Sequence, residues 1–421
     1  MEFSAIKGFK DILPEEIGYW HLLEAEARRL LRLFGFSEIR TPLLEKTELF
    51  SRGIGQDTDI VSKEMYSLKD SKGRSLTLRP EATAAVARAY IQNHLYEKQL
   101  VQKLFSIGPM FRHERPQKGR LRQFHQINVE IFGDPGPRSD ADVIILALEL
   151  FRVIGLEDLT LHVNSLGCPE CRPRFKKQLN RYLEEREKNL CADCRRRTTT
   201  NPLRVFDCKV PGCREIMADA PSIIDSLCDA CVAHFHALKE DLLLAEVSFV
   251  PDHRLVRGLD YYTRTTFEIQ TERLGAQNAV AGGGRYDGLV KLLGGPAYPA
   301  IGFAVGMERV IALLKELSPC AQQSPDLFVA ALGETAQKMS FMWIQELRRA
   351  GLAAEMDYAS RGLKAQLKYA DRLGAKKVLM IGENELKSGK VILRDMSSGA
   401  QEEIDLDGLV EKLCEALSSD E

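Results

Sequence analysis

The spacing of apolar residues along the chain separates helical segments from strands. From Glu15 to Phe34 apolar residues recur every three to four positions, which predicts an amphipathic helix with its buried stripe at Trp20, Leu23, Ala27, Leu30 and Leu31. A second helix is predicted from Asp140 to Val153, with Ser139 as its N-cap. Strand-like runs lie between the two helices. The first 160 residues, together with residues 245–320, therefore predict an α+β unit on an antiparallel sheet.

Residues 105–132 have the pattern of an antiparallel hairpin. In the returning run apolar and polar residues alternate, so the two kinds of side chain lie on opposite faces of the strand. The apolar face holds Ile127, Val129 and Ile131, and the polar face holds Gln126, Asn128 and Glu130.

The tip of this hairpin is strongly basic. It carries five cations opposed by one acidic residue, Glu114, and the five are Arg112, Arg115, Lys118, Arg120 and Arg122. Hairpin tips are commonly charged, but like charges this close repel one another unless an anion lies among them. The tip therefore predicts an anion site.

Three segments between residues 257 and 309 combine glycine with arginine: 257–263, 281–289 and 302–309. Glycine lets the backbone approach a ligand closely, and arginine can bind phosphate through two hydrogen bonds. One such segment is weak evidence, but three beside a basic hairpin indicate a nucleotide site. If the first segment is a strand, Arg257 and Tyr262 point to opposite faces, so a bulge, at Gly258 for example, is needed for both to serve one site.

These motifs resemble those of the class II aminoacyl-tRNA synthetases. The hairpin resembles motif 2, the segment 302–310 resembles motif 3, and Arg40-Thr-Pro-Leu-Leu44 resembles the proline-bearing motif 1. The segments 257–262 and 281–286 resemble the two signatures of the histidine-specific family, histidyl-tRNA synthetase, to which the chain is similar from its first residues to its last.

The segment Arg79-Pro-Glu-Ala-Thr83 matches a further motif of that family, with Ala82 where glycine is usual. The extra methyl group of Ala82 reduces the freedom of the backbone beside the expected amino acid pocket.

The resemblance implies three domains. An antiparallel-sheet class II catalytic domain would comprise residues 1–165 and 246–320, interrupted by a mainly helical, cysteine-rich insertion, 166–245, that lacks the catalytic segments. Residues 326–421 would form an α/β anticodon-binding domain. The pattern agrees, because strand-like runs at 326–332, 353–356 and 377–381 alternate with helical ones at 336–350 and 364–373. Its cations Arg361, Lys364, Lys368 and Arg372 form either an RNA-facing edge or a solvated helix face.

The resemblance also implies a reaction and its residues. Histidine would be activated by ATP with Mg²⁺ and transferred to tRNA(His), with Arg257 as the catalytic residue. The ATP-binding residues would be Arg112, Arg120, Arg257 and Arg309. The histidine-binding residues would be Glu81, Ala82, Thr83, Arg112, Gln126, Glu130, Arg257, Tyr261, Tyr262 and Tyr286. Gln117 and Arg115 would face the acceptor end of the tRNA. Glu130 suits its place because a carboxylate can accept the imidazole N–H and favour one tautomer.

Eight of the ten cysteines form four closely spaced pairs in the insertion: Cys168 and Cys171, Cys191 and Cys194, Cys208 and Cys213, Cys228 and Cys231. Disulfides are disfavoured in the cytosol, and such pairs commonly hold tetrahedral zinc, so two four-thiolate Zn²⁺ sites are one interpretation. A set of free thiols is the other. The resemblance does not decide, because many members of the family lack these cysteines. Cys320 and Cys414 are expected to be ordinary half-buried residues.

Two other functions remain open at this stage. One is a non-catalytic paralogue, the regulatory subunit of the ATP phosphoribosyltransferase of histidine biosynthesis, but four arginines and a complete C-terminal domain argue against it. The other is a class II synthetase for glycine, proline or threonine, against which the Arg-Gly-Leu-Asp-Tyr-Tyr segment argues.

Composition adds limits to this picture. The net charge of −2 over 421 residues shows no overall attraction to nucleic acid, so RNA binding must rest on local basic patches. The N-terminus has no apolar signal core, and no run approaches the roughly 20 apolar residues of a membrane span. We expect a cytoplasmic protein that does not enter the membrane. Motif 1 lies at a dimer interface in the resembled family, so we also expect a homodimer.

Overall fold

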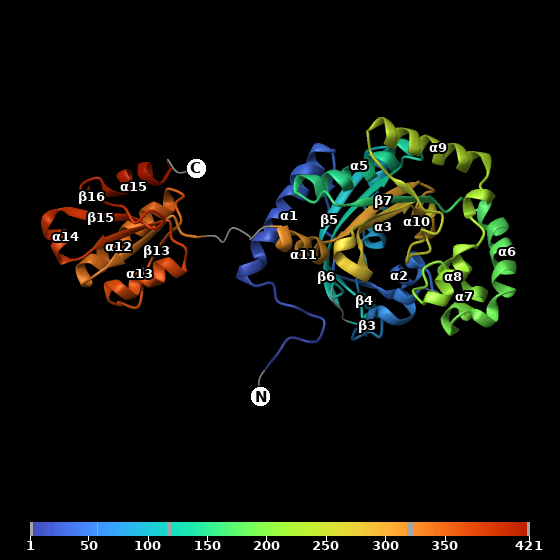
Figure 1. The fold of residues 1–421 in the computed structure, drawn as a ribbon, viewed down its shortest axis with the longest axis horizontal. Coiled ribbons are helices and arrows are strands. Elements are labelled where there is room, and N and C mark those ends of the chain that lie inside the picture. Colours follow the sequence, from blue (N-terminus) through green and yellow to red (C-terminus); the bar gives the residue numbers. More distant parts are fainter. Residues whose placement is uncertain (1–2, 57, 116–118, 318–323, 419–421) are drawn as a thin grey trace. The chain divides into compact units, whose positions relative to one another are not determined.

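The computed structural model describes residues 3–56, 58–115, 119–317 and 324–418, without the side chains of residues 276, 277 and 418. The chain divides into two compact units, Met1–Cys320 and Ala321–Glu421 (Figure 1). Among the described residues, no helix combines the length and the apolar character needed to cross a bilayer. Gln117, Lys118 and Cys320, singled out in the sequence, lie outside the described residues.

Unit 1 is built on an eight-stranded sheet in the order β1-β5-β6-β11-β10-β9-β7-β8. Neighbouring strands are antiparallel except at the two edges, where β1 pairs with β5 and β7 with β8 in parallel. The strands in sheet order are Ser37–Glu38, Gln102–Phe111, Gln123–Phe132, Ala300–Gly306, Ala279–Arg285, Thr263–Gln270, Thr160–Ser165 and Val250–Pro251. The antiparallel hairpin expected at residues 105–132 is the β5–β6 pair.

Four helices cover one face of this sheet: α1 (Pro14–Leu33), α5 (Pro137–Val153), α9 (Asp229–Leu244) and α11 (Met307–Leu317). The apolar side chains of β6 point into the core beneath them, as the alternation in that strand predicts. The prediction of Ser139 as a helix N-cap was wrong. The helix begins at Pro137 behind Gly136, because proline has the φ of a first turn and lacks an N–H.

The opposite face of the sheet carries the polar side chains. Beside it lie a three-stranded sheet, β2 (Leu44–Lys46), β4 (Ser75–Leu78) and β3 (Tyr66–Lys69), and the helices α2 (Thr47–Ile54) and α3 (Thr83–Gln92). A π-helix, Ile60–Glu64, and the short helices α4 (Leu95–Lys98) and α10 (Leu289–Leu292) complete this part of the unit.

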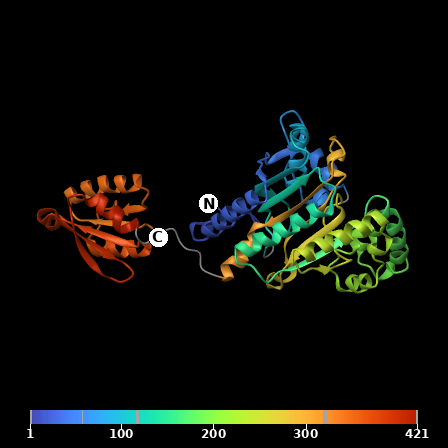
Figure 2. The same ribbon diagram turned by 90° about the horizontal axis from the view of Figure 1, so that it is seen from above.

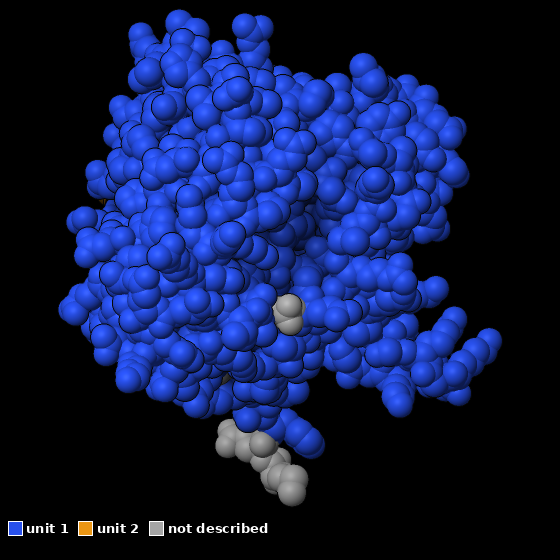
Figure 3. All heavy atoms as spheres, turned by 90° about the vertical axis from the view of Figure 1, so that its right-hand side faces the viewer, with its two compact units in different colours: residues 1–320 blue, residues 321–421 orange. Residues whose placement is uncertain are grey.

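Residues between β7 and α9 form a helical subassembly of α6 (Cys171–Glu184), α7 (Ala192–Thr200), α8 (Pro211–Ala218) and short 3₁₀-helices. They share a small apolar core of their own, which includes Phe175, Leu179, Val205 and Met217. Figures 1 and 2 both show these helices to one side of the large sheet. The face of unit 1 that carries them is hollowed near its middle (Figure 3).

Unit 2 has a five-stranded sheet in the order β13-β12-β14-β15-β16. The strands are Ala354–Met356, Leu327–Ala331, Lys377–Ile381, Lys390–Asp395 and Gln401–Asp405. The first three are parallel, and the last two add antiparallel neighbours. The helices are α12 (Glu334–Arg349), α13 (Leu363–Arg372), α14 (Glu383–Ser388) and α15 (Leu409–Ser418). Cys414 is half-buried against this core.

Candidate active site

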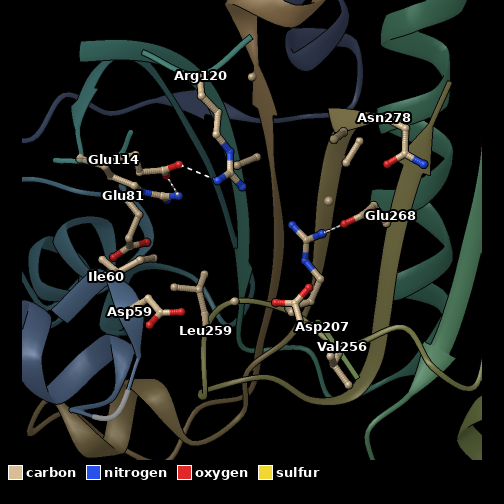
Figure 4. A pocket seen from close by; sticks show the side chains of 18 of the residues that line it. Asp59, Ile60, Glu81, Glu114, Arg120, Asp207, Val256, Leu259, Glu268 and Asn278 are labelled. Carbon is tan, nitrogen blue, oxygen red and sulfur yellow. Dashed lines mark hydrogen bonds and ion pairs between the residues drawn. The ribbon is translucent and has the colours of Figure 1, made fainter. Parts of the chain in front are cut away.

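A cavity of about 1300 Å³ opens on the polar face of the large sheet. Its floor comes from alternate residues of the central strands, including Gln126 and Asn128 of β6, Glu268 of β9, Gly282 of β10 and Gly302 of β11. Its walls come from the hairpin tip, the segment 256–262 and residues of the helical subassembly. Figure 4 shows acidic and basic side chains from these different elements facing the same space.

The four arginines predicted to bind ATP all line this cavity. The Arg112 Nε donates to the Pro80 carbonyl at 2.8 Å, and the Arg120 guanidinium pairs with Glu114 at 2.9 Å. The Arg309 Nη1 donates to the Ala279 carbonyl at 2.6 Å, and Arg257 pairs with Glu268. Figure 4 shows Arg120 beside Glu114 and, across the cavity, Glu268 in its own ion pair. The cations are thus held in place by partners from several elements.

The segment Arg257–Tyr262 is a loop, so the expectation of a strand with a bulge was wrong. The strand β9 begins only at Thr263, and the alternation rule does not apply before it. Both Arg257 and Tyr262 therefore face the cavity. The Arg257 guanidinium lies directly over Gly282 of β10, where any Cβ would overlap it. A side chain at this position would have to displace the end of Arg257 from its place over β10.

Glu130 lies beneath the cavity and is buried. The Thr83 hydroxyl donates to one of its carboxylate oxygens at 2.6 Å, and the Tyr286 hydroxyl donates to the other. Burial raises the pKa of Glu130 to about 8, although the two hydroxyl donors act in the opposite direction. Gly302 of β11 pairs with Glu130 across the strands, and a Cβ there would overlap the carboxylate.

Glu81 is also buried, and it accepts the backbone N–H groups of Thr83 at 2.7 Å and Ala84 at 2.9 Å. It therefore satisfies free N–H groups in the first turn of α3. Burial raises its pKa, opposed by these backbone bonds. Ala82 has a right-handed conformation with φ −98° and ψ −29°, which any residue adopts, so alanine serves here without strain.

The residues predicted from the sequence thus gather in one place, with a few set apart. The cavity is lined by Glu81, Thr83, Arg112, Arg120, Gln126, Arg257, Tyr261, Tyr262, Tyr286 and Arg309. Glu130 and Ala82 are buried behind this lining, and Arg115 is exposed at the hairpin tip.

Several residues of the cavity were not predicted. Glu268 alternates with the core residues Phe267 and Ile269, and that pattern could have placed it on the polar face. Asp207 and Arg197 belong to the helical subassembly, which was expected to lack catalytic segments yet contributes one wall. No local pattern marks these two, because only the tertiary fold brings them to the cavity.

The eight paired cysteines form two clusters in which all sulfur atoms lie within 4.8 Å of one another. Cluster A contains Cys168, Cys171, Cys228 and Cys231, and cluster B contains Cys191, Cys194, Cys208 and Cys213. In cluster A the sulfurs of Cys168 and Cys171 are 3.6 Å apart, far beyond a disulfide bond, and all eight cysteines are free.

Backbone N–H groups point at these sulfurs, and each such bond favours the thiolate, although burial raises the pKa of Cys171 and of Cys213 overall. The Cys228 N–H donates to the Cys171 Sγ at 3.1 Å, and the Cys191 N–H donates to the Cys213 Sγ at 3.2 Å. A backbone bond from Cys194 lowers the pKa of Cys191 to about 7. Four converging sulfurs with N–H support are the donor set of a tetrahedral metal site.

Comparison with known proteins extends over both units. Residues 8–310 match the family model of histidyl-tRNA synthetase, and residues 326–416 match that of an anticodon binding domain. The chain is 55% identical over 408 residues to a histidine–tRNA ligase of Desulfatibacillum aliphaticivorans, with 97% of each chain covered. It is 52% identical over 415 residues to one of Syntrophotalea carbinolica, with 99% of each covered. The crystal structure of apo histidyl-tRNA synthetase from S. aureus superposes with a TM-score of 0.83 at 35% identity, covering 98% of this chain and 100% of that one.

Proposed function

The chain belongs to the histidyl-tRNA synthetase family, and we propose how its residues divide the work of a histidine–tRNA ligase. ATP activates the carboxylate of histidine to histidyl-adenylate, and the terminal ribose hydroxyl of tRNA(His) then attacks the adenylate. Attack at the α-phosphate builds negative charge and releases pyrophosphate. Catalysis therefore depends on placing positive charge where it develops.

The observation that carries this proposal is the convergence of four arginines from separate segments in one cavity. Arg112 and Arg257 hold the α-phosphate and the histidine carboxylate, and Arg257 is the catalytic residue. Arg120 and Arg309 hold the distal phosphates. Glu114 and Glu268 line the cavity, and once released from their ion pairs with Arg120 and Arg257 their carboxylates would hold a Mg²⁺ ion that screens the remaining charge.

The histidine side chain is recognised beside β6 and the loop 257–262. Glu130 accepts the imidazole N–H, while its contacts with Thr83 and Tyr286 keep the carboxylate oriented. Glu81, Ala82, Thr83, Gln126, Tyr261 and Tyr262 complete the pocket. A buried polar partner rejects amino acids without a matching donor far more strongly than an apolar wall does.

The tRNA contacts two parts of the protein. Arg115 is exposed at the hairpin tip and, with Gln117, meets the acceptor end. In unit 2, Lys364, Lys368 and Arg372 are exposed on α13 and face the anticodon stem-loop. Arg361 takes less part, because it pairs with Asp357 and lies over the Tyr369 ring at 4.4 Å.

Each thiolate cluster would hold one structural Zn²⁺. The ligands of the first are Cys168, Cys171, Cys228 and Cys231, and those of the second are Cys191, Cys194, Cys208 and Cys213. When bound, the metal supplies folding free energy to a subassembly whose apolar core is small.

The active form is a cytoplasmic homodimer. Leu43 and Leu44 of motif 1 are 42% and 38% exposed beside the short strand β2, and a two-fold partner would bury them. Light scattering should give twice the chain mass of 47.3 kDa. An active protein at the single mass would remove the dimer from the proposal.

The direct test is attachment of radiolabelled histidine to a tRNA(His) transcript in the presence of ATP and Mg²⁺. We expect charging with histidine alone. A protein that binds histidine tightly but forms neither adenylate nor charged tRNA would instead have the regulatory role of the non-catalytic paralogue.

A further inference from the structure

The catalytic loop, residues 257–262, is held at both of its ends by arginines from the helical subassembly. At the first end, the Arg204 Nη1 donates to the backbone carbonyl of Arg257 at 2.8 Å. At the second end, the Arg172 guanidinium donates to the backbone carbonyl of Tyr262. Neither arginine needs to touch a substrate to act on the loop, because each binds the backbone next to a residue of the proposed site.

Arg204 lies within the segment of chain that cluster B encloses. It lies in the 3₁₀-helix Pro202–Val205 (η3), in the stretch of chain between Cys194 and Cys208. Its side chain is only 10% exposed, and its guanidinium lies 3.3 Å from Asp207 and 4.0 Å from Asp59.

Two neighbours of Arg204 bond the same segment to the rest of unit 1. The Arg197 Nη2 donates to Asp59 at 3.0 Å, and the Asn201 Nδ2 donates to Asp260, within the catalytic loop, at 2.9 Å. The segment between Cys194 and Cys208 is therefore the part of the subassembly that is hydrogen-bonded to the catalytic loop. Cys191 and Cys208 themselves line the cavity.

Arg172 is adjacent in the chain to a cysteine of cluster A. It follows Cys171 directly at the start of α6, and its Nε also donates to the Leu166 carbonyl at 3.4 Å. Leu166 and Gly167 are hydrogen-bonded to the backbone of Arg264, just beyond the catalytic loop. Cluster A thus lies where the subassembly leaves the sheet, beside the second end of the loop.

We propose that the two thiolate clusters, through Arg204 and Arg172, fix the catalytic loop in the geometry that binds histidine. Arg204 and Arg172 are positioning residues. This inference rests on the proposed function, and it gives the metal a role beyond the stability of the subassembly. Loss of either cluster releases one end of the loop that carries Arg257, Tyr261 and Tyr262.

The inference predicts a specific kinetic pattern. The loop carries three of the residues proposed for histidine, Arg257, Tyr261 and Tyr262, whereas two of the four ATP-binding arginines, Arg120 and Arg309, come from the hairpin tip and α11. Releasing the loop should therefore raise the KM for histidine more than the KM for ATP, to which the loop contributes only Arg257. A variant that was merely less stable would lose active molecules, which lowers kcat and leaves both KM values as they are.

The test compares Arg204→Met with Arg195→Met, which removes an exposed cation from the helix α7 nearby. Pyrophosphate exchange would give both KM values, metal analysis the zinc content, and hydrogen exchange the protection of the loop amides. We expect Arg204→Met to keep its zinc, raise the KM for histidine about tenfold to a hundredfold and speed amide exchange in residues 257–262. Arg195→Met should behave like the parent protein.

Cys208→Ser tests the link to the metal independently. It should lose the zinc of cluster B, keep that of cluster A and reproduce the histidine defect of Arg204→Met. Unchanged histidine KM and unchanged loop exchange in either variant would overturn the inference, as would equal defects in Arg204→Met and Arg195→Met. If the parent protein shows no histidine-dependent exchange, the proposed function fails, and amide exchange in the loop still decides the positioning role.

Discussion

Glu130 combines burial with a polar neighbourhood that keeps it in one orientation. The residue is 1% exposed, its carboxylate accepts hydrogen bonds from the hydroxyls of Thr83 and Tyr286, and Gly302 leaves the room that the carboxylate needs. A buried carboxyl group is retained at a cost to stability, so its presence directly beneath the cavity points to recognition of a ligand.

Replacing Glu130 with glutamine should separate the two substrates. The variant keeps the shape but cannot ionise when the imidazole binds. It therefore loses a charge-assisted hydrogen bond worth roughly 1.5–3 kcal/mol, so the KM for histidine should rise while that for ATP stays near its original value. Steady-state pyrophosphate exchange measures both. Equal losses for the two substrates would mean that Glu130 maintains the fold and does not select histidine.

The same side chain should make stability depend on pH. Burial raises the pKa of Glu130 from 4.5 to about 8, so the folded state holds the proton that the unfolded state releases. Its stabilising contribution is complete below pH 4.5 and is lost as the pH rises through 8, by on the order of 4 kcal/mol. Urea unfolding of the parent and of Glu130→Gln at pH 5 and pH 8 measures this, and a difference between the proteins that is independent of pH would contradict it.

At the scale of elements, the glycines of β10 and β11 make the site possible. A Cβ at Gly302 would overlap both the Glu130 carboxylate and the Val129 carbonyl. Gly302→Ala should therefore displace Glu130, cost about 1–3 kcal/mol in the free energy of unfolding and abolish most histidine-dependent activity. Gly288→Ala is a matched control, because nothing lies within 4 Å of a Cβ there and its φ of −88° suits alanine. Full activity in Gly302→Ala would contradict this prediction, because it would show that β6 and β11 can move apart to accept the methyl group.

Periodicity predicted the elements whose faces differ in polarity and failed where local geometry has no period. The β5–β6 hairpin follows from the alternation of apolar and polar residues in 126–131, and α1 follows from its apolar stripe. The loop 257–262 was mistaken for a strand, because its conformation depends on long-range bonds such as that of Asn201 with Asp260. The strands β15 and β16 were not predicted; β16 is mostly exposed and charged.

The residues in sequence motifs were predicted for the candidate site, whereas those that only the tertiary fold brings there were not. The motif arginines and tyrosines do meet in one cavity. The spacing of the cysteines predicted four pairs, but which pairs combine depends on the path of the chain through α6 to α9. Asp207, Arg197 and Arg204 reach the loop or the cavity only through tertiary structure, so no sequence pattern could have assigned them there.

For the whole molecule, activation and tRNA recognition should be separable. Every described residue that lines the cavity lies in unit 1, and unit 2 has apolar cores of its own. A protein without residues 326–421 should therefore keep histidine-dependent pyrophosphate exchange, whereas charging of tRNA(His) should fall steeply because the anticodon contacts are gone. Both assays on the truncated and the full chain measure this. Loss of exchange on truncation would show that unit 2 supports the catalytic unit.

The central claim is that this cavity makes histidyl-adenylate with Arg257 as its catalytic residue. It is tested most directly by amino-acid-dependent pyrophosphate exchange into ATP, with each of the twenty amino acids, for the parent protein and for Arg257→Ala. One preorganised charge contact to a developing oxyanion is worth ~3–4 kcal/mol, so we predict exchange with histidine alone and a loss of about a hundredfold to a thousandfold in the variant. Exchange with another amino acid, or undiminished exchange in a folded Arg257→Ala protein, would contradict the account.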